Sequence, residues 1–321
     1  MSDMPSRVQI NEEGPREGFQ FEKGAIPTAR KIELIDALSA TGLNHIQVAS
    51  FVNPARVPGW ADADAVVAGF TRRPGVEYTA LWLNLKGLER AMATNRLNIN
   101  GSFSLTASAA FLARNQQRSM EDNVTAARDT VAMYKRHGIP MKRAGLMAAF
   151  GCNFEGDIPH ARVLEMIQLL LDICAEYDVA PDLFSLADTM AWATPASVRA
   201  LVGKVRERFP DLTLGLHLHD TRGLGIANAY AGLEMGVANF DATVAGLGGC
   251  PFAAHKGAAG NVCTEDLVFM CDEMGIETGI DLDALIEAAR LAEDIVGHPL
   301  PGAVKMGGSL KRYRHGGDPS P

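Results

Sequence analysis

The sequence has few cysteines and lacks any apolar run long enough to cross a bilayer. Its five cysteines are odd in number and form no CxxC pair: Cys152, Cys174, Cys250, Cys263 and Cys271. This usage gives no disulfide framework and is typical of a reduced chain whose cysteines are small core residues. No basic start followed by an apolar run resembles a secretory signal, so we expect a cytoplasmic protein without membrane spans.

The chain also lacks an excess of basic charge. Its 30 Lys and Arg residues stand against 38 Asp and Glu residues, a net charge of -8. This balance gives no electrostatic footprint for nucleic acid or for an anionic membrane. No low-complexity linker interrupts the middle of the chain, so one domain is expected over residues 7–300. The polar ends predict a disordered N-terminus over residues 1–6 and a flexible tail over residues 301–321.

Short β-rich runs alternate with helical patterns along the whole chain. The expected strands are 8–12, 45–49, 77–82, 97–104, 141–148, 183–187, 213–218 and 239–244. The expected helices between and after them are 28–40, 61–69, 85–93, 120–136, 159–176, 194–208, 226–235 and 264–273. Eight strand–helix units predict an α/β protein of the (β/α)8 TIM-barrel class, with an extra C-terminal helix over 281–295.

The stretch LTLGLHLHDTRG, residues 212–223, places two imidazoles at the end of the seventh expected strand. Because side chains alternate along a strand, His217 and His219 share a face, about 6.6 Å apart. In a barrel the intervening leucines would face the helices, and the histidines would face the lumen at its mouth. The pattern is compatible with ordinary polar residues at a strand end or with half of a metal site.

Other polar residues follow other strands, where barrel enzymes carry their chemistry. Arg16 and Glu17 follow the first strand, although a solvated surface turn is the alternative interpretation. Asp188 ends the sixth strand, and Asn84 and Lys86 follow the third. Each is a weak signal alone, and their convergence on one rim is what indicates a site.

The segment after the eighth strand is rich in glycine. Glycines at 246, 248 and 249 precede Cys250, which makes this thiol a better reactive candidate than the other four. Asn261 follows, and its amide oxygen is a hard ligand suited to Mg²⁺ or Mn²⁺.

Taken together, these residues resemble the hydroxymethylglutaryl-CoA lyases, a family within a TIM-barrel superfamily of metal-dependent lyases and synthases. The resemblance covers about residues 7–300. It rests on the segments GPREGFQFEK, SFVNPARVPGWAD, LNLKG, FGCNFEG, LADTM, HLHDTRG.G.AN and AGLGGCPFA....GAAGN..TEDLV. The last two are long and specific.

The resemblance implies retro-Claisen cleavage of a 3-hydroxy-3-substituted acyl-CoA to acetyl-CoA and an oxo compound by a homodimer. It implies Mg²⁺ or Mn²⁺ as cofactor, bound by Glu17, His217, His219 and Asn261. Arg16 would stabilise the enolate oxygen, and Cys250, assisted by Asp188, would transfer a proton. His217 is expected to share in proton transfer, and the substrate-binding candidates are Gln47, Asn84 and Lys86.

The chain departs from the lyase pattern at several positions. Glu17 stands where the lyases have Asp, and Gln47 stands where they have Glu, so one carboxylate is longer and the other is replaced by a neutral amide. The 250–261 loop is two residues longer and carries His255 and Lys256. The pocket candidates Ala148, Ala149 and Asn153 also differ from the usual residues. These changes favour a related acyl group over the namesake substrate.

Two other functions are compatible with the same sequence. A synthase or aldolase of this superfamily would act on a 2-oxo acid, but such synthases generally carry a C-terminal regulatory domain, and the GLGGCP loop favours the lyases. A barrel-shaped binding protein without turnover is the non-enzyme alternative. Cleavage of an acyl-CoA would separate it from an enzyme, whereas metal content alone would not.

Overall fold

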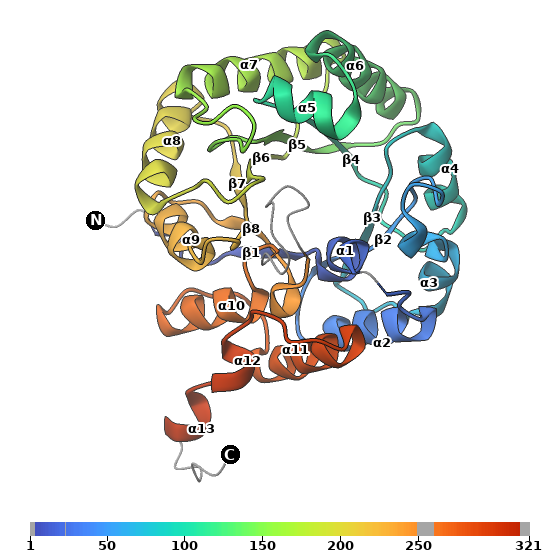
Figure 1. Cartoon of the computed structure of the whole chain (residues 1–321), viewed down its shortest axis with the longest axis vertical. Coiled ribbons are helices and arrows are strands. Elements are labelled where there is room, and N and C mark those ends of the chain that lie inside the picture. The colour runs from blue at the N-terminus through green and yellow to red at the C-terminus, as the bar shows by residue number, and fades with distance from the viewer. Residues whose placement is uncertain (1–3, 23, 249–259, 315–321) are drawn as a thin grey trace.

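Eight parallel strands form a curled sheet, and helices surround it on the outside (Figure 1). The computed structural model describes residues 4–22, 24–248 and 260–314. The strands follow one another around the sheet in the order β3-β2-β1-β8-β7-β6-β5-β4. Their bounds are β1 Gln9–Glu12, β2 His45–Ser50, β3 Glu77–Leu81, β4 Gly101–Thr106, β5 Met141–Met147, β6 Leu183–Asp188, β7 Leu214–Leu218 and β8 Asn239–Ala242. This is the predicted barrel class.

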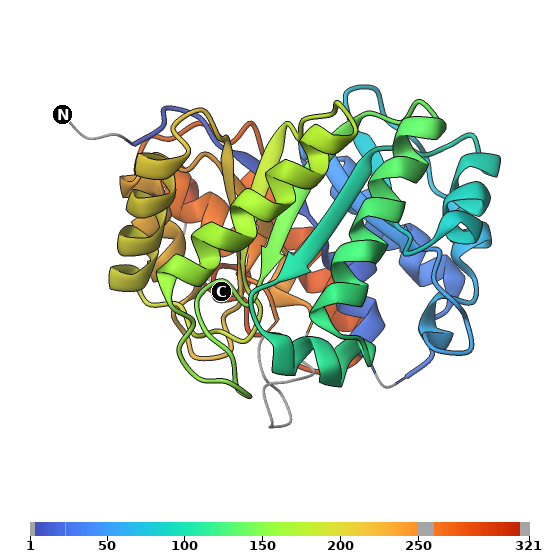
Figure 2. The ribbon, with the colours of Figure 1, turned by 90° about the horizontal axis from the view of Figure 1, so that it is seen from above.

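The helices cover the outer face of the sheet, as the side view in Figure 2 shows. The principal ones are α2 Thr28–Ser39, α3 Ala63–Gly69, α4 Leu85–Ala93, α6 Met120–Arg136, α7 His160–Glu176, α8 Pro195–Arg208, α9 Gly225–Glu234 and α10 Thr264–Glu273. The sequence also predicted the extra helix, α11 Leu282–Val296, which packs against α2 and α10. Short helices that it did not predict include α1 Phe19–Phe21 and α5 Ala109–Gln116.

The alternation in β7 shows how the strands sort their side chains. Leu214, Leu216 and Leu218 are buried, and Leu216 packs against α9 so closely that a Cβ on Gly232 would lie 2.5 Å from its Cδ1. Burial of each leucine contributes roughly 1.5–3 kcal/mol. His217 lies between them in the sequence and therefore points to the lumen.

The ladder is not continuous between β3 and β4 within the described residues. Asn98 bridges the gap: its backbone N–H donates to the Tyr78 carbonyl oxygen (2.8 Å), and its side-chain oxygen accepts from the Tyr78 N–H (3.1 Å). The strand expected over 97–104 therefore begins later, at Gly101. The Asn98 side chain thus accepts a hydrogen bond that a backbone carbonyl of the neighbouring strand accepts elsewhere in the sheet.

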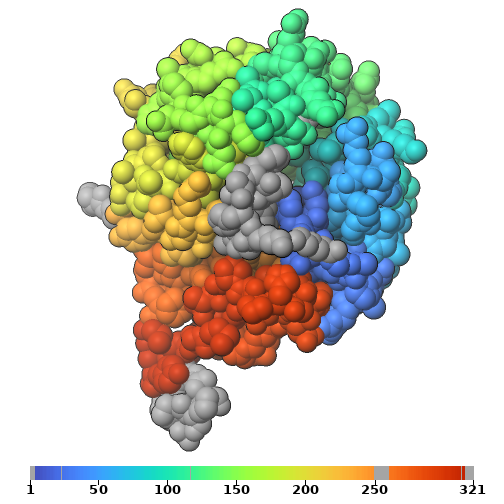
Figure 3. Space-filling model, viewed as in Figure 1, coloured from blue at the N-terminus to red at the C-terminus, as the bar shows by residue number. Residues whose placement is uncertain are grey.

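Residues 301–314, which fall in the predicted flexible tail, contain two short helices, α12 Val304–Gly307 and α13 Lys311–Arg314. Lys305 is buried and its Nζ lies 2.7 Å from Glu293 of α11. Figure 3 shows this C-terminal part, in red, beside the barrel.

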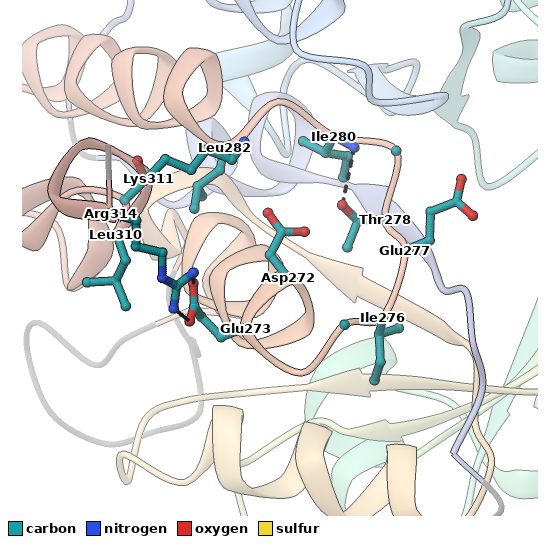
Figure 4. A pocket seen from close by; sticks show the side chains of 13 residues that line it. Asp272, Glu273, Ile276, Glu277, Thr278, Ile280, Leu282, Leu310, Lys311 and Arg314 are labelled. Carbon is teal, nitrogen blue, oxygen red and sulfur yellow. Dashed lines mark hydrogen bonds and ion pairs between the residues drawn. The ribbon is translucent and has the colours of Figure 1, made fainter. Parts of the chain in front are cut away.

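Arg314 of α13 also reaches Glu273 of α10, with contacts of 3.0 and 2.6 Å. These two residues edge a groove of about 430 Å³, also lined by Asp272, Ile276 and Lys311 (Figure 4). The groove lies at the barrel end where β1 begins, because Val8 N–H donates to the carbonyl of Glu277, another lining residue.

Within the described residues, no helix combines the length and apolar character needed to cross a membrane.

Candidate metal centre

Three side chains meet at the C-terminal end of the sheet. Glu17 lies on a wide helical turn, Gly14–Gly18, that follows β1, and His217 and His219 lie at the end of β7. Glu17 Oε1 is 3.9 Å from His217 Nε2 and 3.8 Å from His219 Nε2. Two metal–ligand bonds of 2.1 Å span at most about 4.2 Å, so one small cation can lie between these donors.

Each histidine is held through its other ring nitrogen. His217 Nδ1 lies 3.0 Å from Asp241 Oδ2, and His219 Nδ1 lies 2.9 Å from the backbone carbonyl oxygen of Asp188. A carboxylate and a carbonyl can only accept, so both Nδ1 atoms carry the hydrogen. Each Nε2 therefore faces Glu17 and remains available to bind a proton or a metal ion, which is how metal-binding histidines are oriented.

The charges around the histidines favour a cation. Burial opposes a charge on His217, but its hydrogen bond to Asp241 and the nearby Glu17 carboxylate raise its pKa to about 9. Burial likewise opposes ionisation of Glu17, yet the Arg16 guanidinium and the two histidines hold the pKa of Glu17 well below its usual range. The site thus stabilises positive charge between the imidazoles and keeps a carboxylate ionised.

Asn261 is the fourth ligand expected from the sequence, and it lies beside His219. It pairs with His219 through an isolated β-bridge, and its side chain is buried. Its Oδ1 and Nδ2 are buried without a hydrogen-bond partner among the described residues. A buried polar group without a partner costs about 1–3 kcal/mol, and coordination would satisfy the amide oxygen. One carboxylate, two imidazoles and one amide oxygen are a donor set that fits a divalent cation.

Asp188 lies next to this group at the end of β6. Its Oδ1 accepts from the backbone N–H groups of Trp192 (2.7 Å) and Ala193 (3.0 Å). Its Oδ2 is buried and has no hydrogen-bond partner within the described residues. Burial raises the pKa of Asp188 to about 6, although His219 and these hydrogen bonds oppose the rise. Such a carboxyl group can exchange a proton near neutral pH.

Arg16 is fixed on the other side of Glu17. Its Nη2 lies 2.6 Å from Glu13 Oε2 and 3.1 Å from Glu17 Oε2, and its Nε donates to Gln47 Oε1. The indole N–H of Trp60 donates to the Arg16 carbonyl oxygen at 3.1 Å. The guanidinium is thus held in one orientation at the edge of the candidate site.

Residues that were not predicted from the sequence support the centre from inside the barrel. Asp241 of β8 accepts from Asn11 Nδ2 (3.0 Å), from Arg143 Nη1 (3.0 Å) and from Arg143 Nη2, besides holding His217. Asn11, Asp241 and His217 are neighbours in the register of β1, β8 and β7. A signal was present, because Asp241 is a charged residue at a lumen-facing position of an apolar strand.

A second missed carboxylate, Glu12, fixes the frame of the site. It is fully buried and accepts from Gly14 N–H (2.7 Å), Val244 N–H (2.9 Å) and the Thr264 hydroxyl (2.6 Å). Burial raises its pKa to about 8, and these three hydrogen bonds oppose the rise. Glu12 therefore connects the turn that carries Glu17 to the segments after β8.

The remaining site residues predicted from the sequence are Gln47, Asn84, Lys86 and Cys250. The Gln47 amide contacts Arg16, and Asn84 is the N-cap of α4, accepting from Gly87 N–H at 2.9 Å. Lys86 is exposed in the first turn of α4. Cys250, the proposed proton donor, lies outside the described residues, as do His255 and Lys256.

Fold and site together define an α/β-barrel protein with a candidate divalent-metal centre at the rim where barrel enzymes carry their active sites. The family model described as HMGL-like matches residues 7–292, and the chain belongs to this family.

Curated relatives are carbon–carbon lyases of similar length. The mitochondrial hydroxymethylglutaryl-CoA lyase of Gallus gallus is 40% identical over 88% of this chain and 91% of its own. The 3-hydroxy-3-isohexenylglutaryl-CoA/hydroxymethylglutaryl-CoA lyase of Pseudomonas aeruginosa is 39% identical over 90% of this chain and 92% of its own. The protein is accordingly a carbon–carbon lyase of the hydroxymethylglutaryl-CoA lyase type.

Solved structures agree with this assignment. The hydroxymethylglutaryl-CoA lyase of Pseudomonas aeruginosa superimposes with a TM-score of 0.87 at 36% identity, covering 95% of this chain and 98% of that one. The lyase of Acinetobacter baumannii, in complex with coenzyme A and 3-methylmalate, gives a TM-score of 0.84 at 36% identity, covering 98% of each chain.

Proposed function

We propose that this lyase cleaves hydroxymethylglutaryl-CoA, or a thioester with another substituent at C3, to acetyl-CoA and an oxo acid. The observation that carries the proposal is the convergence of Glu17 Oε1 with the Nε2 atoms of His217 and His219 beside the immobilised Arg16. When bound, a divalent cation supplies Lewis-acid polarisation of substrate oxygens and a template for chelation.

The reaction begins with removal of the proton from the tertiary hydroxyl group. We assign this proton to Asp188, through the Oδ2 atom that has no hydrogen-bond partner within the described residues, because His217 uses Nδ1 for Asp241 and Nε2 for the cation. As the proton leaves, the C3 oxygen forms a carbonyl and the C2–C3 bond breaks. The electron pair passes into the thioester, which becomes the enolate of acetyl-CoA.

We assign Arg16 to stabilise that enolate. Within the described part of the chain its contacts use Nε and Nη2, so Nη1 donates to none of those residues. A preorganised donor of this kind acts where negative charge develops. Cys250 is assigned to protonate the enolate carbon, which completes acetyl-CoA.

Two residues near the rim of the barrel, Lys86 and Asn153, bear on substrate binding. Lys86 is assigned to the acyl-CoA because it is exposed beside the barrel mouth. Asn153, one of the positions that departs from the lyase pattern, accepts from the indole N–H of Trp192 at 2.7 Å. This pairing joins the loops after β5 and β6 next to Asp188. The proposal of a C3 substituent other than methyl rests on the departures from the lyase pattern at Ala148, Ala149 and Asn153.

The finer assignments follow the family resemblance. We assign Mg²⁺ or Mn²⁺ as the cation, a homodimer as the assembly and the cytoplasm as the location. Light scattering of the purified protein tests the homodimer, and a monomer at micromolar concentration would contradict it.

The decisive experiment is a panel of 3-hydroxy-3-alkylglutaryl-CoA thioesters, including the methyl compound, incubated with purified protein and Mg²⁺ or Mn²⁺. We expect acetyl-CoA to appear from at least one thioester, and the double variant His217→Ala/His219→Ala to release none. Absence of acetyl-CoA across the panel, with metal bound to the wild-type protein, would refute the proposed function.

A further inference from the structure

Glu13 is a buried carboxylate that the reaction described above does not use. It directly follows β1, and its side chain is only 6% exposed. Its Oε2 lies 2.6 Å from Arg16 Nη2, and its Oε1 lies 3.8 Å from Arg143 Nη1. Glu13 is therefore placed between two guanidinium groups that have different roles.

The two guanidinium groups contact different parts of the site. Arg16 is assigned to the enolate under the proposed function, whereas Arg143 pairs with Asp241, which in turn pairs with His217. Three carboxylates, those of Glu13, Glu17 and Asp241, thus lie beside two arginines. Among the described residues, Glu13 is the carboxylate that pairs with both guanidinium groups. Without it, Arg16 would keep Glu17 and Gln47 as partners but would lose the contact that holds Nη2 from the side of β1.

The opposite edge of Arg16 is held by a neutral group. Gln47 Oε1 accepts from Nε, so the amide fixes the orientation of the guanidinium but adds no negative charge. Glu13 and Glu17 supply the charge through Nη2, which leaves Nη1 directed away from these contacts. A carboxylate at position 47 would face the same guanidinium from its Nε edge.

We propose that Glu13 is a positioning residue that fixes Arg16 for the enolate, and that its longer contact with Arg143 holds Glu13 itself in place. This inference rests on the proposed function. It assigns to Glu13 no contact with the substrate and no proton transfer.

The test compares Glu13→Gln with the double variant Glu13→Gln/Gln47→Glu, which moves the carboxylate from one edge of Arg16 to the other. Steady-state kinetics with a thioester that the wild type cleaves gives kcat and KM, and calorimetric titration with Mn²⁺ alone gives metal affinity. Glu277→Gln, at an exposed ion pair with Arg7, is the control.

We expect Glu13→Gln to lower kcat about 100-fold, the cost of misplacing a catalytic group by about 1 Å, while KM and Mn²⁺ affinity change less than about threefold. The double variant should recover at least about tenfold of that loss, and the control should match the wild type. A merely structural ion pair would show no such recovery.

Unchanged kcat in Glu13→Gln, no recovery in the double variant, or a fall in Mn²⁺ affinity parallel to kcat would each overturn the inference. If Glu13→Gln does not fold, Glu13→Asp keeps the charge at shorter reach. A loss of kcat in that variant with normal Mn²⁺ affinity supports the inference, and wild-type kcat overturns it. An inactive wild-type protein would instead refute the proposed function.

Discussion

For single residues, the candidate centre depends on which atom of each side chain is already in use. His217 and His219 commit Nδ1 to Asp241 and to a backbone carbonyl, and this leaves both Nε2 atoms for the shared site. Asp241 makes further contacts, since its carboxylate also accepts hydrogen bonds from Arg143 and Asn11. Removing its charge therefore affects the tautomer of His217 and leaves the partly buried guanidinium of Arg143 poorly paired.

Asp241→Asn should weaken Mn²⁺ binding about 10- to 100-fold, the usual effect of losing a partner that orients a metal-binding histidine. Calorimetric titration of the purified variant with MnCl₂ measures it. Asp182→Asn is the matched control, because Asp182 forms an exposed ion pair with Lys142. Equal Mn²⁺ affinity in Asp241→Asn and wild type would show that Asp241 does not orient His217.

Among the elements, the ends of strands and helices decide where the functional groups lie. The Gly14–Gly18 turn is a π-helical turn, a form often found at functional sites. It is tightly packed, since a Cβ at Gly14 would lie 2.5 Å from Glu12 Oε1 and one at Gly18 would lie 2.6 Å from Leu247 Cβ.

On the outside of the barrel, capping side chains fix where the helices begin. At the start of α8, the Thr194 hydroxyl accepts from the Ser197 N–H and the Ser197 hydroxyl accepts from the Thr194 N–H, an arrangement known as a capping box.

Thr194→Ala should lower the free energy of unfolding by about 1 kcal/mol, because the hydroxyl that accepts from Ser197 N–H is lost. Urea denaturation followed by circular dichroism measures the change. Thr125→Ala, at an exposed position inside α6, should change stability by less than about 0.5 kcal/mol. Equal effects of the two substitutions would argue against a capping contribution.

In the molecule as a whole, the candidate metal centre joins distant parts of the chain. Glu17 follows the first strand, the histidines end the seventh, and Asn261 lies beyond the eighth. Glu12 links the same segments through Val244 and Thr264. A cation bound at this point would hold the first and last units of the barrel together and would favour the folded state.

Saturating Mn²⁺ should therefore raise the thermal midpoint of the wild type, and EDTA should lower it. The expected stabilisation is about 2.7 kcal/mol at a free metal concentration 100 times Kd. Differential scanning calorimetry over a series of MnCl₂ concentrations measures it. The His217→Ala/His219→Ala variant serves as the control, since its midpoint should not respond. A wild-type midpoint independent of Mn²⁺ would contradict binding at this site.

Local patterns in the sequence were sufficient to predict the barrel and most of its parts. Eight strand–helix units predicted the class, and α6 and α10 have the predicted bounds because caps and apolar periodicity are local signals. The pairing of His217 with His219 also followed from the strand period alone. The start of β4 did not, since the side chain of Asn98 replaces the expected ladder hydrogen bonds with Tyr78.

The positions of the charged residues that support the candidate centre, in contrast, depend on tertiary contacts. Glu13, Arg143 and Asp241 come from parts of the chain that are distant in sequence, and only sheet register and lumen packing bring their charges together. The Gln47 amide likewise gained a partner, Arg16, that no local pattern indicates. Local patterns reveal which face a side chain takes, whereas closure of the barrel decides which charges meet on that face.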